Sequence, residues 1–502
     1  MPDKAFWRVI SPWILPVLAL VVFSVYALTL VFSVGVGCAD DAYHAVIAKN
    51  LALGRGYTST IQDGRTDFLA LQFDPRVGVG PVIIFPASLI IRIFGNTYWA
   101  PGLAHVLLWS SLCIGIGLLT RKYQSGAGLS LAALSFFYLG FALMTFHFEQ
   151  WYALLGEIPA ALLIILAVLL FFHHNSGLYQ CLAGIALSLA AQAKLLSLLA
   201  FAVFILCLAI FQMSDRSKKV PARLKELIHR TVYLSIGFII PVLTFEIWKL
   251  FELGPSGYMN NVGSYVSFVK NKGIDHGQAL SLLALYKARA AIIYDRFGIA
   301  LQSVGFMLAL AGLLISRDKK LWRIYIVFVS MIIFYLFWWI FISVGWARYF
   351  IIPLILIIGA ASLPFLASYH RKWLWLYFIL IVIWPAGTWD RLAYPSSFID
   401  SGYFNPTKRT ESLLKTSNML ARAHSKNRII TQWWATAADL EYISDSHLIF
   451  TTYRDEPYKQ ATPYLIAADT RFVDPNDKEF IELVNSCRGL SNADIYLVYK
   501  CE

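Results

Sequence analysis

Residues Leu178 to Met213 read LYQCLAGIALSLAAQAKLLSLLAFAVFILCLAIFQM, an apolar block interrupted near its middle by Lys194. Its 36 residues would form a helix of about 54 Å, much longer than the roughly 30 Å of a bilayer's hydrocarbon core. The block therefore predicts two short membrane spans that meet at Lys194. A lysine there, at the outer end of both spans, avoids the cost of a charge within lipid.

The composition agrees with a membrane protein. Of the 502 residues, 58% are hydrophobic and 14% charged, too few charges to cover a soluble protein of this length. The net charge of +12 raises the possibility of nucleic-acid binding. The basic residues, however, cluster in short loops between apolar blocks, which is typical of cytoplasmic loops. We therefore expect no nucleic-acid partner.

Placing the basic loops inside gives about eleven spans, with the N-terminus cytoplasmic and the C-terminus outside. We expect a retained first span from Trp13 to Val36, because it exceeds a cleavable signal segment. Loops are expected from Arg216 to Arg230 on the inside and from Gly254 to Arg296 on the outside. The fold class is mainly α, a polytopic helical bundle that forms a transmembrane catalytic domain over residues 1–394.

The first outer loop, residues 37–96, is expected to carry two helices outside the bilayer. The first runs from Ala42 to Leu53 and ends at Gly54 and Gly56, since glycine favours helix C-termini. The second, Pro81 to Phe94, is apolar but too short to span and contains Arg92, which indicates an interfacial helix.

Residues 395–502 have a soluble composition and predict a small α/β domain on the outer (periplasmic or extracellular) face. Strand patterns begin at Arg428, His447, Tyr464 and Asp494, and helix patterns cover Thr436 to Ser444 and Asp477 to Ser486. Cys487 and Cys501 can form a disulfide if this domain faces an oxidising compartment. The sequence shows no phosphate-binding glycine loop and no standard zinc motif.

Asp40 and Asp41 stand where the first outer helix begins. One interpretation is helix capping, since carboxylates accept bonds from free N–H groups at a helix start. The other is a general base, because adjacent carboxylates at a partly desolvated surface hold one pKa near the working pH. The local sequence slightly favours capping.

A set of short motifs resembles the GT-C superfamily of glycosyltransferases, especially its family 39 and aminoarabinose-transferase-like members, which use polyprenyl-phosphate sugars. The motifs occur in the family's order and cover the membrane half of the chain. They are Asp40-Asp41-Ala-Tyr43 through Gly54-Arg-Gly56-Tyr57, Gly80-Pro81 through Phe94-Gly95, Gly156-Glu157-Ile-Pro159, Ala193-Lys194, and Ala347-Arg348-Tyr349-Phe350-Ile-Ile-Pro353.

The resemblance implies inverting transfer of a hexosyl or pentosyl group from a polyprenyl-phosphate donor to a hydroxyl of an envelope glycan, lipid or protein. Lipopolysaccharide components are among these acceptors. It further implies that Asp40, or else Asp41, is the base. Arg348, Lys194 and Arg76 would then bind the donor's lipid phosphate without a metal. A divalent metal held by the carboxylates is the alternative.

Each of these residues also has a structural interpretation. Lys194 can reach the interface by snorkelling, and Arg348 can anchor the chain there. Glu157 is either a helix cap or a second acidic site residue. Asp74-Pro75-Arg76 stands where aminoarabinose-transferase-like members carry Glu-Lys-Pro; the charge types match, but the spacing differs. Asp74 is, like Glu157, a candidate for a second acidic site residue.

Two other functions fit a polytopic protein: a secondary transporter, and another envelope-polymer transferase or ligase. A transporter should show corresponding halves and helices interrupted at the midplane, and the sequence shows no clear internal repeat. The site candidates instead fall at one predicted surface, next to a soluble domain, which favours the glycosyltransferase.

Overall fold

A computed structural model of the chain describes residues 21–59, 71–120, 152–273, 282–292, 319–366, 406–422, 428–444, 449–452, 464–470 and 473–501, apart from a few single positions. The predicted third, eighth and eleventh spans lie outside these residues, as does the beginning of the first. The chain forms two compact units. We call them the helical unit (the described parts of Met1–Val25, Leu108–Phe148 and Gly156–Leu392) and the mixed unit (those of Tyr26–Leu107, Glu149–Leu155 and Ala393–Glu502).

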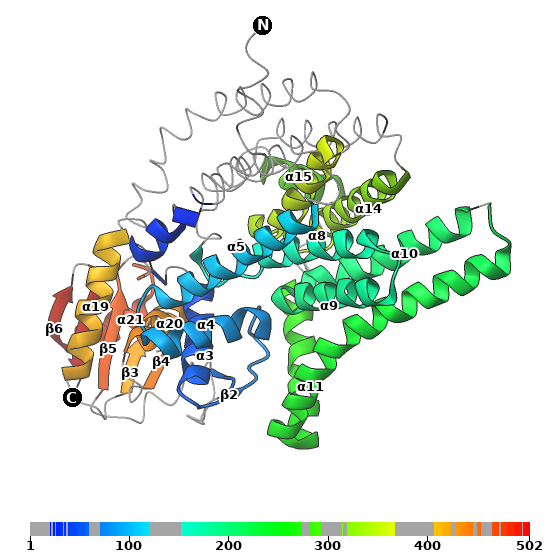
Figure 1. Ribbon diagram of the computed structural model, residues 1–502. Coiled ribbons are helices and arrows are strands. Elements are labelled where there is room, and N and C mark those ends of the chain that lie inside the picture. The colour runs from blue at the N-terminus through cyan, green and yellow to red at the C-terminus, as the bar shows by residue number, and fades with distance from the viewer. Residues whose placement is uncertain are drawn as a thin grey trace, which may run out of the picture. The chain divides into compact units, whose positions relative to one another are not determined.

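The helical unit consists of long apolar helices (Figure 1). They are α8 (Glu157–His173), α9 (Gly177–Ala193), α10 (Leu198–Ser214), α11 (Val220–Gly273), α12 (Leu282–Ile292), α14 (Lys319–Phe341) and α15 (Ile351–Leu366). α9 packs against α8 and α11, while α14 packs against α10 and α15. A Cβ added at Gly184 of α9 or at Gly237 of α11 would strike the backbone of the other helix. Small residues thus bring these two helices together, as is common in membranes.

The predicted break at Lys194 is confirmed. α9 ends at Ala193, and Lys194 has extended backbone angles of φ −151° and ψ 117°. A short 3-10 helix, η2 (Leu195–Ser197), then leads into α10. The segment Pro81–Phe94 is the helix α4 with the predicted bounds.

The two predicted loops beside the seventh span were wrong in large part. α11 already begins at Val220, and it continues to Gly273 across a non-helical residue, Gly254 (φ 66°, ψ 169°). Hydropathy recognises membrane spans, but polar segments also form helices. Here Gly254 supplies a left-handed turn, and Pro255 is well suited to the first turn of the helix after it.

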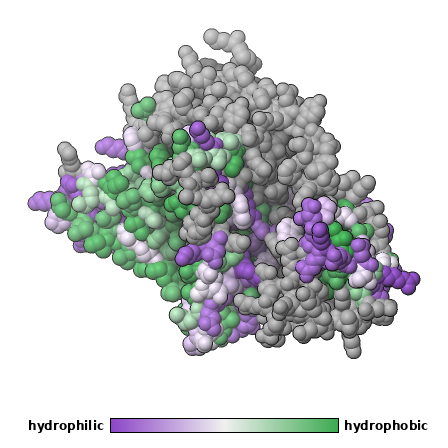
Figure 2. Space-filling view, turned by 180° about the vertical axis from the view of Figure 1, so that it is seen from behind, coloured by the Kyte–Doolittle hydropathy of each residue, from purple (hydrophilic) through white to green (hydrophobic). Residues whose placement is uncertain are grey.

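Four of the described helices are long and apolar enough to cross a membrane: Ala100–Leu119 within α5 (Ala100–Thr120), Leu195–Ser214, Val220–Asn271 and Lys319–Phe341. Figure 2 shows a broad hydrophobic surface, and the exposed apolar side chains include Leu206, Ile210, Ile236, Ile240 and Leu243. Apolar surface of this extent is suited to lipid. The chain is an integral, multi-pass membrane protein; the count of eleven spans stays a prediction.

The mixed unit contains the first outer loop and the C-terminal α/β fold. α3 (Ala39–Ala52) is followed by the paired strands β1 (Thr58–Ser59) and β2 (Leu71–Gln72) and by α4. The C-terminal part comprises α19 (Pro406–Arg422), β3 (Arg428–Thr431), α20 (Trp434–Ile443), β4 (Ile449–Thr452), β5 (Tyr464–Asp469), α21 (Lys478–Asn485), β6 (Arg488–Ala493) and β7 (Tyr496–Cys501). The domain boundary near residue 395 stays a prediction.

The five strands form one mixed sheet in the order β4-β3-β5-β7-β6. β3 pairs in parallel with β4 and β5, and β7 pairs antiparallel with β5 and β6. α21 covers one face through Phe480, which packs with Ile430 and Ile466. α20 lies on the other face, where the Tyr496 hydroxyl is 3.5 Å from Asp439 Oδ2. Alternation of side chains along the strands produces these two faces.

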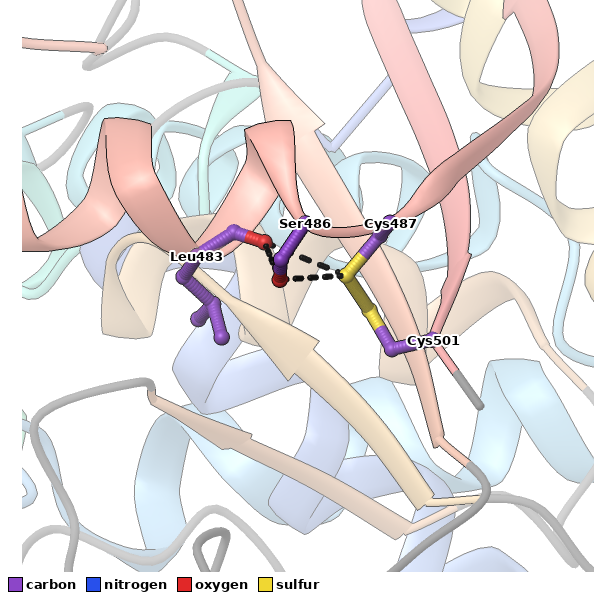
Figure 3. Close-up of a disulfide and its surroundings, with 4 residues drawn as sticks. All are labelled: Leu483, Ser486, Cys487 and Cys501. Carbon is purple, nitrogen blue, oxygen red and sulfur yellow. Dashed lines mark hydrogen bonds between the residues drawn. A yellow bond between two sulfur atoms is a disulfide. The ribbon is translucent and has the colours of Figure 1, made fainter.

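Cys487 and Cys501, whose pairing the sequence left open, form a disulfide in the structure (Figure 3). It joins the chain just after α21 to the end of β7. In the C-terminal part, the sequence analysis missed two of the described elements, α19 and β6. The residues of β6, RGLSNA, include no β-branched or aromatic side chain, so they carry little strand signal. Pairing with β7 makes them a strand.

Candidate functional site

The acidic pair lies in the first turn of α3, which begins at Ala39, three residues before the predicted start at Ala42. Asp40 is half-buried, whereas Asp41 is 1% exposed. Both carboxylates therefore lie where the positive end of the helix dipole favours negative charge.

Asp41 does more than lie at the start of its own helix; it binds a distant peptide. Leu154 donates its backbone N–H to Asp41 Oδ1 at 2.6 Å. One turn along α3, His44 Nδ1 lies 2.7 Å from the Leu154 carbonyl oxygen. A carbonyl only accepts, so His44 carries its proton on Nδ1. Together the two side chains bind both polar groups of Leu154, and Asp41 thereby gains a fixed orientation.

Asp74 and Arg76 form a second cluster with α3. Asp74 is 4% exposed and accepts three bonds from Arg76, from its backbone N, Nε and Nη2, at 2.9, 3.1 and 2.9 Å. The Tyr43 hydroxyl donates to Asp74 Oδ2, and Ser59 Oγ donates to the Tyr43 hydroxyl at 3.1 Å. Burial, aided by the Asp74 charge, raises the pKa of Tyr43 well above its ordinary value. The phenol therefore stays a donor, and Asp74 ties the loop to α3.

The helical unit holds a compact charge cluster of Glu157, Lys194 and Arg348. Glu157, in the first turn of α8, has a side chain that is 0% exposed. Lys194 Nζ lies 2.8 Å from Glu157 Oε1, and Arg348 Nε lies 4.0 Å from the same oxygen. One buried carboxylate thus faces two cations, and the cluster carries a net charge of +1.

Aromatic rings surround the two cations. Arg348 lies 4.4 Å from the ring centre of Trp346 and 5.6 Å from that of Tyr349. Lys194 Nζ lies 5.3 Å from the ring centre of Tyr349. The Arg348 side chain keeps 22% of its surface exposed, against 10% for Lys194. Arg348 is therefore the more accessible cation for an anionic ligand.

A tight turn before Arg348 depends on a third arginine. Arg289 of α12 is 9% exposed and donates from Nη2 to the Ser343 carbonyl at 3.0 Å. Gly345 has φ +71°, and a Cβ there would collide with the Arg289 guanidinium. Glycine is thus favoured at position 345 by its backbone conformation, and any side chain there would displace the Arg289 guanidinium.

Glu441 of α20 is a buried carboxyl, 8% exposed. Burial raises its pKa from 4.5 to about 7, and the charges of Lys49 and Arg55 oppose this rise. The folded protein thus binds the Glu441 proton more tightly than the unfolded chain does. The contribution of Glu441 to the free energy of unfolding is therefore largest below its unfolded pKa, and it falls as the pH rises from about 4.5 to about 7.

We expect Glu441→Gln to remove this penalty. At pH 8 the variant should gain up to about 3 kcal/mol of stability, from 1.36 kcal/mol per pKa unit. Its melting temperature in detergent should exceed that of the wild type at pH 8 and equal it near pH 4.5. A melting temperature at or below wild type at pH 8 would show that Glu441 is stabilised as a carboxylate.

The candidate residues thus fall into three groups. Asp74 forms an ion pair with Arg76, and Glu157 forms ion pairs with Lys194 and Arg348. Asp41 accepts a hydrogen bond from the Leu154 backbone N–H. The parts that His44 and Tyr43 play in these networks were not predicted, although both residues lie on α3 within one turn of Asp41. Among the described residues, no three His, Cys, Asp or Glu side chains gather as a metal site.

Solved structures of other proteins include folds that are similar to the fold of this chain. The chain is similar to ArnT from Cupriavidus metallidurans bound to undecaprenyl phosphate, with 12% identity, 96% of this chain and 97% of that chain covered, and a TM-score of 0.59. The apo state of the same protein gives 13% identity, the same coverages and a TM-score of 0.54. An oligosaccharyltransferase from Archaeoglobus fulgidus tethered with an acceptor peptide gives 12% identity, coverages of 90% and 69%, and a TM-score of 0.49.

No family model and no curated protein sequence matches the chain. At these identities, the similarity to ArnT establishes the fold: mainly helical, with a small C-terminal mixed sheet. The predicted fold class, a mainly helical membrane protein with a small C-terminal α/β part, is thereby confirmed.

Proposed function

We propose that this chain is a membrane glycosyltransferase of the GT-C type that transfers a sugar from a polyprenyl-phosphate donor to an acceptor hydroxyl. The observation that carries the proposal is the similarity, over almost the whole of both chains, to an ArnT structure bound to undecaprenyl phosphate. This similarity favours a transferase over the secondary transporter. The acceptor is an envelope glycan, lipid or protein.

The charge cluster suits the donor phosphate. A polyprenyl-phosphate sugar is a phosphodiester with one negative charge, which matches the net +1 of Glu157, Lys194 and Arg348. When the sugar leaves, the phosphate acquires a second charge. Arg348, which can donate two parallel bonds to phosphate oxygens, and Lys194 would stabilise that charge as it develops.

The acidic pair supplies the base in this proposal. A carboxylate, with Asp40 the first choice, accepts the proton of the acceptor hydroxyl. The acceptor oxygen attacks the anomeric carbon, and the bond from that carbon to the phosphate oxygen breaks. Its electron pair leaves with the polyprenyl phosphate, and the configuration at the anomeric carbon inverts. Arg76, bound to the buried Asp74, orders the loop beside α3 and is a further candidate for phosphate contact.

We place the C-terminal domain on the outer face, with the N-terminus cytoplasmic. The disulfide of Cys487 and Cys501 supports this orientation, because disulfides persist in oxidising compartments. The acceptor would then be modified outside the cytoplasm. Mass spectrometry of envelope glycolipids and glycans from cells that lack the protein should reveal an acceptor without its sugar. An unchanged glycan and lipid profile would contradict the proposal.

Arg348→Ala should weaken the use of the donor. Loss of a charged hydrogen bond to phosphate costs about 1.5–3 kcal/mol, so kcat/KM for a radiolabelled polyprenyl-phosphate sugar should fall by roughly 10-fold to 100-fold. Arg348→Lys keeps the positive charge without the forked geometry of the guanidinium, so its kcat/KM should fall less than that of Arg348→Ala. If both variants keep the donor dependence of the wild type, Arg348 does not bind the phosphate.

A further inference from the structure

Helix α20 of the C-terminal fold ends against side chains of the first outer loop. The last carbonyl groups of a helix have no partner within the helix and need one elsewhere. In α20 these carbonyls accept bonds from residues that precede it by more than 340 positions in the chain. The contact lies wholly within the mixed unit.

Lys49 supplies the strongest of these bonds. It lies in the last turn of α3, is 3% exposed, and donates from Nζ to the carbonyls of Glu441 and Ser444, both at 2.6 Å. A buried ammonium group at the negative end of a helix dipole is stabilised by that end. Lys49 therefore caps α20 across the fold and joins its end to the end of α3.

Asn96 covers the two carbonyls in between. Its Nδ2 donates to Tyr442 at 3.4 Å and to Ile443 at 3.3 Å. The carbonyls from Glu441 to Ser444 are thus all bound by the first outer loop.

Tyr442 adds another bond to the docking contact. Its side chain is fully buried, and its hydroxyl donates to the Thr97 carbonyl at 2.8 Å. Burial, and then the charge of Asp41, raises the pKa of Tyr442 well above its ordinary value, so the phenol stays a donor. α20 packs against α3, the helix that carries the acidic pair in its first turn and Lys49 in its last turn.

From this geometry we infer that the C-terminal domain positions the proposed base. Lys49, Asn96 and Tyr442 act as positioning residues: they dock α20 on α3, and this contact keeps Asp40 and Asp41 where the acceptor hydroxyl is deprotonated. The inference rests on the proposed function, since it assigns a role in the same reaction to the docking contact. It gives the C-terminal domain a part in catalysis besides any contact with the acceptor.

The test compares Lys49→Met, Lys49→Arg and the matched control Lys478→Met, an exposed lysine of α21. In the full-length protein, Lys49→Met should lower kcat by roughly 10-fold to 100-fold, as expected for a displaced catalytic group, with the donor KM unchanged. Lys49→Arg should recover most of kcat, since a guanidinium also donates to two carbonyls. Lys478→Met should behave as the wild type.

Hydrogen exchange of α3 measures docking independently of transfer. Lys49→Met should speed amide exchange in residues 39–52, and the control should not. Unchanged exchange or an unchanged kcat in Lys49→Met would overturn the inference. If Lys49→Met does not fold, Tyr442→Phe, which loses only the bond to Thr97, should show the same changes at smaller size. If the amides of α3 exchange slowly in the wild type but the wild type transfers no sugar, the proposed function is contradicted while the docking contact is established.

Discussion

Asp40→Asn should lower kcat by about 10³-fold, the contribution expected of a general base, while the protein keeps its melting temperature and its membrane insertion. Asparagine has nearly the same shape as aspartate but cannot accept a proton at working pH. Asp40 is half-buried, so an acceptor hydroxyl can reach it more easily than it can reach Asp41. The measurement is transfer from a radiolabelled polyprenyl-phosphate sugar.

Asp41→Asn provides the internal comparison. The amide side chain of this variant would still accept the bond from the Leu154 N–H through its oxygen, so the structural role of Asp41 would survive. We expect this variant to lose less than about tenfold in kcat, because it keeps the geometry that a general base requires. Asp474→Asn, at an exposed site of the C-terminal domain, should have no effect.

The outcomes separate the two carboxylates. If Asp41→Asn abolishes transfer and Asp40→Asn does not, Asp41 is the base and Leu154 orients it. If both variants retain full activity, neither carboxylate takes the proton and the proposed mechanism is wrong.

Glu157→Gln should strongly destabilise the helical unit. The substitution leaves Lys194 and Arg348 without their common carboxylate, and breaking a buried ion pair from one side costs about 3–5 kcal/mol. The melting temperature in detergent should fall accordingly. The double variant Glu157→Gln with Lys194→Met should recover part of the loss, because it also removes Lys194, the less exposed of the two stranded cations.

Binding of a phosphate ligand tests whether the cluster of Glu157, Lys194 and Arg348 binds the donor or is a purely structural ion pair. Without Glu157 the two cations carry a net charge of +2, so a short-chain polyprenyl phosphate should bind more tightly and raise the melting temperature of Glu157→Gln more than that of the wild type. An equal or smaller rise in Glu157→Gln would mean that Lys194 and Arg348 do not bind the donor phosphate.

Local sequence predicted several features because their causes are local. α4 has the predicted bounds because Pro81 favours the start of a helix and Gly95 the end of one. The break at Lys194 follows from the cost of a charge within lipid. The pairing of Cys487 with Cys501, by contrast, was left open by the sequence and is seen only in the structure. The helices after Gly254 and at Pro406–Arg422 were missed because their polar residues resemble those of loops.

The sequence by itself therefore determined the membrane class, the break at Lys194 and the types of charged residue at the site. The partners of those residues were decided only by the tertiary structure. Asp41 binds a peptide 113 residues away and Lys49 caps a helix 392 residues away. Glu157 meets Lys194 and Arg348 from three separate segments of the chain. Hydropathy and helix capping act over a few residues of chain, whereas a buried charge is satisfied by whichever group the packing brings to it.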